Sequence, residues 1–155
     1  MKKLEFISKI GETYQVYEAA LATLSEAQMH APRTHGEWSI KDVIAHVTWY
    51  EREMVGVLRS RTLVGSNLWN MPLEQRNDVI FTENKDHSLA DVLAESRKIH
   101  REFMELLQDL SDEDLLDASH FREMPLDWLP WQVIASNTCE HYPGHATDIL
   151  KVFPK

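Results

Sequence analysis

A helix start and an apolar stripe occur together in Gly36-Glu37-Trp38-Ser39-Ile40-Lys41-Asp42-Val43-Ile44-Ala45-His46-Val47-Thr48-Trp49-Tyr50-Glu51. Ser39 is a favourable N-cap, and Asp42 places an acid in the first turn, where the helix dipole stabilises it. Residues at helical spacing then follow one side of the helix. They are Ile40, Val43, Ile44, Val47, Glu51, Met54 and Leu58. We therefore predict an amphipathic helix that begins at Ser39 and runs to about Leu63.

A histidine lies at the shoulder of this stripe. At about 100° per residue, His46 is roughly 120° from the centre of the stripe. Tyr50 and Glu53 follow four and seven residues later and share that shoulder. They are candidates for a catalytic acid and base, and the alternative is a packed ring and a solvated carboxylate.

A second histidine element is His141-Tyr142-Pro143-Gly144-His145, near the other end of the chain. Histidines at i and i+4 on a helix share a face and can bind one metal ion. With His46 on a separate helix, they form a candidate three-histidine metal site. Pro143 cannot donate to the carbonyl of Cys139, so we predict a kink there. The kink either widens the seam to admit metal and substrate or spoils the spacing of the two histidines.

Composition limits the class of protein. A chain of 155 residues is the size of one domain, so we predict a single domain over residues 1–155. The net charge of -9 argues against nucleic acid or an anionic membrane as a partner. We see no apolar run of about 18 residues and no signal peptide. The single cysteine, Cys139, fits a reducing compartment, and we expect a cytoplasmic location.

The remaining segments also show helical periodicity. We predict a first helix over residues 3–24, a capped short turn at Ser25-Glu26-Ala27-Gln28, and a third long helix from Ser88 to about Leu110. Pro72 suits the first turn of a short extra helix, and Pro130 suits the first turn of the last helix. Four long helical patterns without strand alternation predict an all-α four-helix bundle, with a short extra helix between the second and third long helices.

Three segments carry a family resemblance. They are Gly36 to His46, the run Arg76-Asn77-Asp78-Val79-Ile80-Phe81-Thr82-Glu83-Asn84-Lys85-Asp86, and Trp131 to Tyr142. Together they resemble the DinB-like superfamily of four-helix bundles, and within it the ClbS/DfsB-type branch. The resemblance implies a divalent metal, zinc or nickel, held by His46, His141 and His145.

The resemblance also sets the functional expectation. The branch includes proteins that disarm reactive small molecules by hydrolysis, and the superfamily includes thiol-dependent transferases and isomerases. We expect a metal-dependent hydrolase of a small reactive electrophile, with a metal-bound water as nucleophile and a role in detoxification or self-protection. The alternatives are a transferase that uses a low-molecular-weight thiol cosubstrate, and a non-catalytic protein that binds or sequesters a small molecule. A homodimer is plausible for a bundle of this superfamily.

Overall fold

The structure is a computed structural model that describes residues 1–32 and 38–153. The helices in chain order are α1 (Lys3–Ala22), α2 (Glu26–His30), α3 (Ile40–Ser60), η1 (Asn67–Asn70), α4 (Leu73–Asn84), α5 (Leu89–Gln108), η2 (Glu113–Leu115), η3 (Ala118–His120), α6 (Pro130–Ser136) and α7 (Tyr142–Val152). Within the described residues, extended pairing is limited to two isolated bridges. The prediction of an all-α fold is confirmed.

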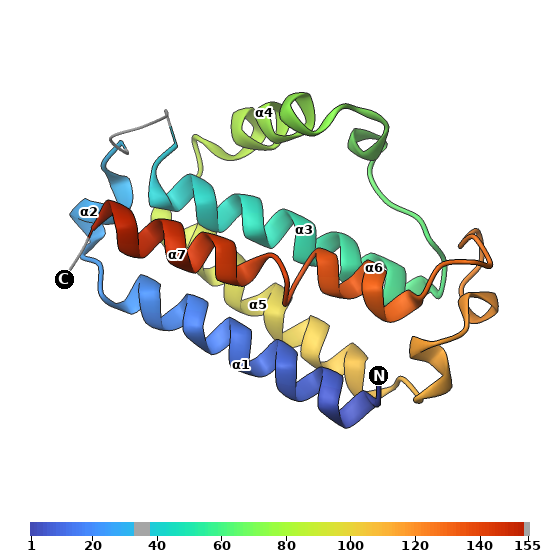
Figure 1. Cartoon of the computed structure of the whole chain (residues 1–155). Helices are drawn as coiled ribbons and strands as arrows, with labels where there is room; N and C mark the ends of the chain where they lie inside the picture. Colours follow the sequence, from blue (N-terminus) through green and yellow to red (C-terminus); the bar gives the residue numbers. More distant parts are fainter. Residues whose placement is uncertain (33–37, 154–155) are drawn as a thin grey trace.

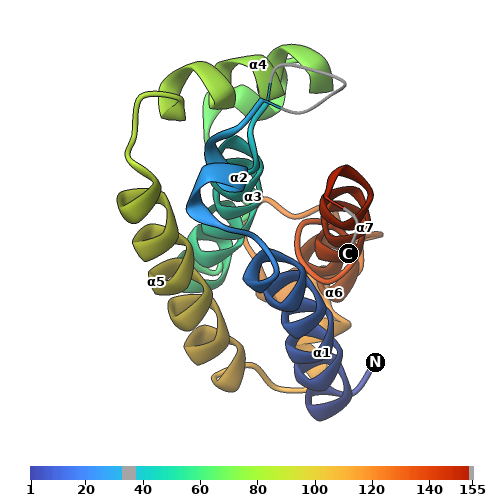
Figure 2. The same cartoon turned by 90° about the vertical axis from the view of Figure 1, so that its left-hand side faces the viewer.

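Four helical rods form the bundle, and the fourth rod consists of α6 and α7 (Figure 1). α3 packs along α5, and α1 packs along α7. α4 lies outside the bundle against α3, as Figure 2 shows. The predicted bundle with an extra helix between its second and third long helices is therefore confirmed, whereas the single-domain boundary at 1–155 stays a prediction.

α3 begins as its sequence predicts. The Ser39 side chain accepts a hydrogen bond from the Asp42 amide, and the Asp42 carboxylate accepts one from the Ser39 amide. Such a capping box satisfies two amide groups that the first helical turn leaves unpaired. Gly36 and Glu37, which open the quoted segment, lie outside the described residues.

α3 ends at Ser60, three residues before the predicted end. Arg61 adopts the left-handed conformation (φ 50°, ψ 44°), and its amide donates to the carbonyl of Val57. This cap turns the chain away from the helix axis. No glycine marks the position, so the sequence pattern gave no sign of the stop.

The last helix differs most from its prediction. The sequence pattern predicts one helix kinked at Pro143, but α6 ends at Ser136 and α7 begins at Tyr142. The Glu140 amide donates to the carbonyl of Ala135 at 2.9 Å, one residue further back than in an α-helix. Pro143 then occupies the first turn of α7, where its missing N–H costs nothing. The helix therefore breaks before His141 and restarts.

Candidate metal centre

Three histidines from distant parts of the chain converge in the seam between α3 and α7. His46 lies in the second turn of α3, His141 is the N-cap residue of α7, and His145 lies one turn further along α7. Nε2 of His141 is 3.1 Å from Nε2 of His46 and 2.9 Å from Nε2 of His145. One potential ligand atom from each residue lies within 4.8 Å of the other two. Ring nitrogens bound to one tetrahedral zinc at 2.0–2.1 Å would be about 3.3 Å apart, so the spacing fits a metal.

Burial keeps two of these imidazoles neutral. His46 is 5% exposed, and burial, aided by His145 and His141, lowers its pKa to about 2. Burial and the neighbouring His145 lower the pKa of His141 to about 3. A neutral imidazole is the form that binds a metal ion, so these two residues are ready ligands at neutral pH.

Hydrogen bonds within the described part of the protein satisfy only some of the ring nitrogens of His46 and His141. Nδ1 of His46 and Nδ1 of His141 are buried, and neither has a hydrogen-bond partner among residues 1–32 and 38–153. The Nε2 atoms point toward one another. In a hydrogen bond between two rings, one Nε2 donates its proton and only the other uses its lone pair. A cation at the same point would accept the Nε2 lone pairs of all three rings, and the two Nδ1 atoms would keep their protons without a partner in that part of the chain. The donor set therefore fits a metal ion better than a packed hydrogen-bonded cluster.

Aromatic rings enclose one side of the cluster. The Trp38 ring centroid is 5.2 Å from that of His46, and the Trp38 ring stacks on Phe81 of α4 at 5.9 Å. The Tyr50 ring centroid is 5.0 Å from both His46 and His141. These rings exclude water from the histidines and lower the local dielectric constant, which strengthens electrostatic interactions at the site.

Tyr50, the predicted acid or base, lies beside the cluster. Its hydroxyl donates to Oδ1 of Asn77 at 2.8 Å and accepts a long contact of 3.5 Å from Nη1 of Arg76. Both partners belong to α4, so α4 fixes the orientation of the phenol. Its catalytic role stays a prediction.

Glu53, the other predicted catalytic residue, is engaged elsewhere. It lies seven residues, or about 10 Å, beyond His46 along α3. Its Oε1 accepts hydrogen bonds from the Ser66 amide at 2.6 Å and from Nε1 of Trp69 at 2.7 Å. The structure thus brings Tyr50 but not Glu53 to the histidines, and the base role of Glu53 also stays a prediction.

A buried polar group that the sequence pattern does not predict lies behind the site. Glu51 is 2% exposed, and its Oε2 accepts a hydrogen bond from the Tyr142 hydroxyl and lies 3.2 Å from Nδ1 of His100. The His100 ring stacks on Tyr14 at 3.4 Å. The sequence signal for this group is a glutamate inside the apolar stripe of α3. A buried carboxylate needs polar partners, so Glu51 indicates that such partners lie nearby.

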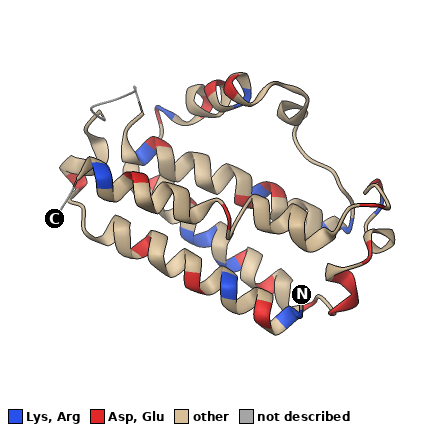
Figure 3. Ribbon diagram, viewed as in Figure 1, with Lys and Arg blue, Asp and Glu red and all other residues tan. Residues whose placement is uncertain are grey.

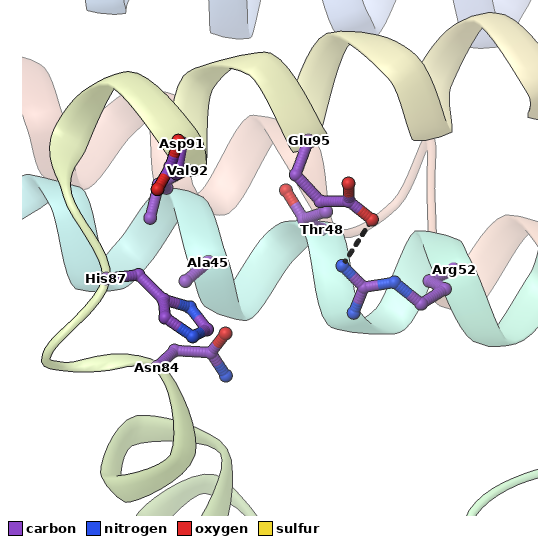
Figure 4. Close-up of a pocket in the computed structure, with 8 residues that line it drawn as sticks. All are labelled: Ala45, Thr48, Arg52, Asn84, His87, Asp91, Val92 and Glu95. Carbon is purple, nitrogen blue, oxygen red and sulfur yellow. Dashed lines mark hydrogen bonds and ion pairs between the residues drawn. The ribbon is translucent and has the colours of Figure 1, made fainter.

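A polar depression lies on another face of α3. It has a volume of about 380 Å³ between α3, α5 and the α4–α5 connection. Figure 4 shows Arg52 paired with Glu95 at one end and His87 beside Asn84 at the other. The Arg52 and Glu95 side chains are 3.1 Å apart. Lys41 holds this connection by donating to the carbonyls of Lys85 and His87. The depression does not include the three histidines.

Comparison with known proteins supports the fold. The sequence model of the DinB superfamily matches residues 9–146. Similar solved structures include DfsB, a sibling lethal factor precursor, at 18% identity and a TM-score of 0.82, covering 97% of this chain and 94% of that one. A protein from Streptococcus pneumoniae has 15% identity and a TM-score of 0.83, with 97% and 90% covered. No curated protein sequence matches the chain significantly.

A third solved structure corrects the expectation about partners. The colibactin self-resistance protein ClbS, in complex with a dsDNA, has 15% identity and a TM-score of 0.81 and covers 99% of this chain and 96% of that one. The exclusion of nucleic acid was therefore wrong. Net charge is a sum over the whole surface, whereas binding depends on local charge. Figure 3 shows basic residues interspersed with acidic ones along the bundle.

At these identities the solved structures show a shared fold. The predicted resemblance to DinB-like bundles is confirmed, with DfsB and ClbS among the proteins that share the architecture. As for a membrane, the described helices include none with the length and apolar run needed to cross one.

Proposed function

The chain belongs to the DinB superfamily, and we propose that it is a metal-dependent hydrolase that disarms a small reactive electrophile. The observation that carries the proposal is the convergence of His46, His141 and His145 with two of the rings held neutral by burial. The names of DfsB and ClbS, a lethal factor precursor and a self-resistance protein, support a role in self-protection. A cytoplasmic location and a homodimeric state belong to the same proposal.

The three histidines would hold zinc or nickel through nitrogen atoms, which suit both metals. Three protein ligands leave a coordination position open, the usual condition for catalysis. The ion would supply Lewis-acid activation of water or of the electrophile.

The residues around the histidines prepare the site for this chemistry. Trp38 and Tyr50 screen His46 from bulk water. The Tyr50 hydroxyl, oriented by Asn77, is the group that we assign to deliver a proton to the leaving group. Glu51, through Tyr142, ties the start of α7 to α3 and so positions His141.

Metal content tests the first half of the proposal. Protein purified without a histidine tag and offered zinc or nickel at neutral pH should bind about one ion per chain, as measured by elemental analysis. His46→Ala should lose most of this metal while its far-ultraviolet circular dichroism stays helical. His87→Ala, which removes an exposed histidine outside the cluster, is the matched control and should bind metal like the wild type. A wild type that takes up neither metal would overturn the proposal.

Turnover tests the second half. The metal-loaded protein should hydrolyse an excess of an activated ester such as 4-nitrophenyl acetate through many cycles, and His46→Ala should not. Reaction of 1-chloro-2,4-dinitrobenzene only in the presence of an added thiol would identify a thiol transferase instead. Consumption of one equivalent of probe per chain would identify a binder that is exhausted at each site.

DNA binding is a second candidate function, favoured by the ClbS structure with its dsDNA. Fluorescence anisotropy with a labelled duplex tests it. Specific binding should persist near 150 mM salt, whereas an affinity that disappears between 50 and 150 mM salt would reflect phosphate contacts alone.

A further inference from the structure

A cavity of about 520 Å³ lies between α3, α6 and the segment of residues 63–70. Its apolar walls include Met54, Val57 and the indoles of Trp69 and Trp128. Every polar side chain that lines it belongs to a serine or an asparagine, within the part of the chain that the structure describes. The cavity therefore combines aromatic surface with uncharged hydrogen-bonding groups, and its volume is typical of a site for a drug-sized molecule.

The wall formed by residues 63–70 is held in place by Glu53. Its Oε1 receives hydrogen bonds from the Ser66 amide and the Trp69 indole at 2.6 and 2.7 Å. A Cβ atom added at Gly65 would come within 2.7 Å of Nε1 of Trp69 and 2.8 Å of Oε1 of Glu53. Glycine is therefore required for the close approach of this segment to α3.

Trp69 is also fixed from a second helix. The Arg76 guanidinium lies 4.6 Å from the Trp69 ring centroid and donates through Nε to the carbonyl of Leu68. A cation over an indole face is a favourable interaction. Trp69 is thus a rigid wall of the cavity, and its position does not depend on a ligand.

The cavity lies next to the residues that surround the three histidines. Tyr50 connects the two, because its ring centroid lies 5.6 Å from that of Trp69 and 5.0 Å from that of His141. Asn137, which lines the cavity, precedes His141 by four residues. Along α3, Met54 lies eight residues, or about 12 Å, beyond His46. A molecule in the cavity would therefore lie one ring, that of Tyr50, away from the histidines.

Trp128 is the remaining aromatic wall. Its side chain is 45% exposed although it lines the cavity. An exposed indole leaves a large apolar face in water. Covering that face with another apolar group is favourable. An aromatic ligand would provide that cover.

From these observations we propose that the cavity binds the body of the substrate, and that this body is an uncharged aromatic molecule carrying amide or hydroxyl groups. The inference rests on the proposed function, because it gives the substrate class of the same site. The asparagine and serine side chains pair with amide and hydroxyl groups, and the two indoles pack against the aromatic ring. A charged ligand would be desolvated there without a counter-charge from the lining.

Three probes with one aromatic core test the charge preference. They are 2-naphthamide, 2-naphthoate and 2-naphthylmethylammonium, which are neutral, anionic and cationic at neutral pH. Isothermal titration calorimetry should give one site per chain for the amide, at an affinity at least tenfold higher than for either ion. Equal affinities for the three probes would overturn the assigned ligand class.

The five indole N–H signals in a ¹H–¹⁵N spectrum locate the bound probe. 2-Naphthamide should shift the signals of Trp69 and Trp128 and leave that of Trp131, which packs on Phe6, unchanged. Trp128→Ala should weaken binding at least fivefold, whereas Leu126→Ala, on the same loop and 81% exposed, should bind like the wild type. Binding that Trp128→Ala leaves unchanged would place the probe elsewhere and overturn the proposal.

The same titration in His46→Ala separates this proposal from the metal proposal. We expect the metal-free variant to bind 2-naphthamide within threefold of the wild type, because His46 does not line the cavity. A wild type that binds the amide but no metal would contradict the proposed function and leave the cavity assignment standing. A wild type that binds metal but not the amide would contradict the cavity assignment alone.

Discussion

The hydroxyl of Tyr142 donates a hydrogen bond to Oε2 of Glu51, which joins the first residue of α7 to the middle of α3. Both side chains are almost completely buried. Burial and the nearby Glu51 carboxylate raise the pKa of Tyr142 well above its ordinary value, so the phenol remains a donor. Because Tyr142 directly follows His141, this bond also fixes the position of His141, the proposed metal ligand at the start of α7.

Tyr142→Phe should therefore lower both stability and metal affinity. It leaves a buried carboxylate with one partner fewer, and we expect the free energy of unfolding to fall by about 1.5–3 kcal/mol in urea titrations. The control is Tyr17→Phe, since the Tyr17 hydroxyl is buried without a hydrogen-bond partner in the described residues and its removal should be nearly neutral. If both variants lose equal stability, the Glu51 contact contributes nothing specific.

The cap of α3 gives a second prediction. Ser39→Ala removes the side-chain acceptor of the Asp42 amide in a buried capping box, and we expect a loss of about 1 kcal/mol. Ser25→Ala removes the equivalent acceptor at the exposed start of the one-turn helix α2 and should cost less. Thermal and urea unfolding measure both. A larger loss at Ser25 would show that α2, not α3, limits the stability of the bundle.

Stability of the metal-free protein should depend on pH through His46 and His141. Their folded-state pKa values of about 2 and about 3 lie below the ordinary value of 6.5. Below pH 6.5 the unfolded chain therefore takes up protons that the folded chain does not, and stability falls as pH falls toward 3. The expected slope is up to about 1.4 kcal/mol per pH unit for each residue.

Urea titrations between pH 7 and pH 4 in the presence of a chelator measure this slope. His46→Gln should make it shallower, and His87→Gln, at an exposed position outside the cluster, should not. An identical slope in wild type and His46→Gln would mean that His46 is not a buried neutral group in the metal-free protein.

The bundle was predictable because its signals are local. The apolar stripe after Ser39 and the acid at Asp42 fix the start and the buried face of α3 without knowledge of any partner. The shoulder position of His46 and the i,i+4 spacing of His141 and His145 likewise indicate side chains that a neighbouring helix can bring together.

The features that were not predicted depend on distant partners. Glu51 is visible in the stripe, but Tyr142 lies 91 residues away and His100 lies 49 residues away. The left-handed cap at Arg61 has no glycine to mark it. The role of Glu53 follows from the approach of Trp69, which is set by a loop whose path has no periodic signal. In each case tertiary packing decides what the local pattern leaves open.

The break before α7 gives the last prediction. Pro143 lacks the N–H that a continuous helix would donate to the carbonyl of Cys139, and the chain instead makes a wide turn before His141. Pro143→Ala supplies that N–H and favours joining α6 to α7, which would rotate His141 relative to His145. We expect zinc affinity, measured by competition with a chelating dye, to fall at least tenfold, or about 1.4 kcal/mol. The control is Gly144→Ala, where the added Cβ meets nothing within 4 Å and no N–H is gained. This control should gain about 0.5–1 kcal/mol of stability from helix propensity and bind zinc like the wild type. Zinc affinity that Pro143→Ala leaves unchanged would show that the break is set by residues 135–140 and not by the proline.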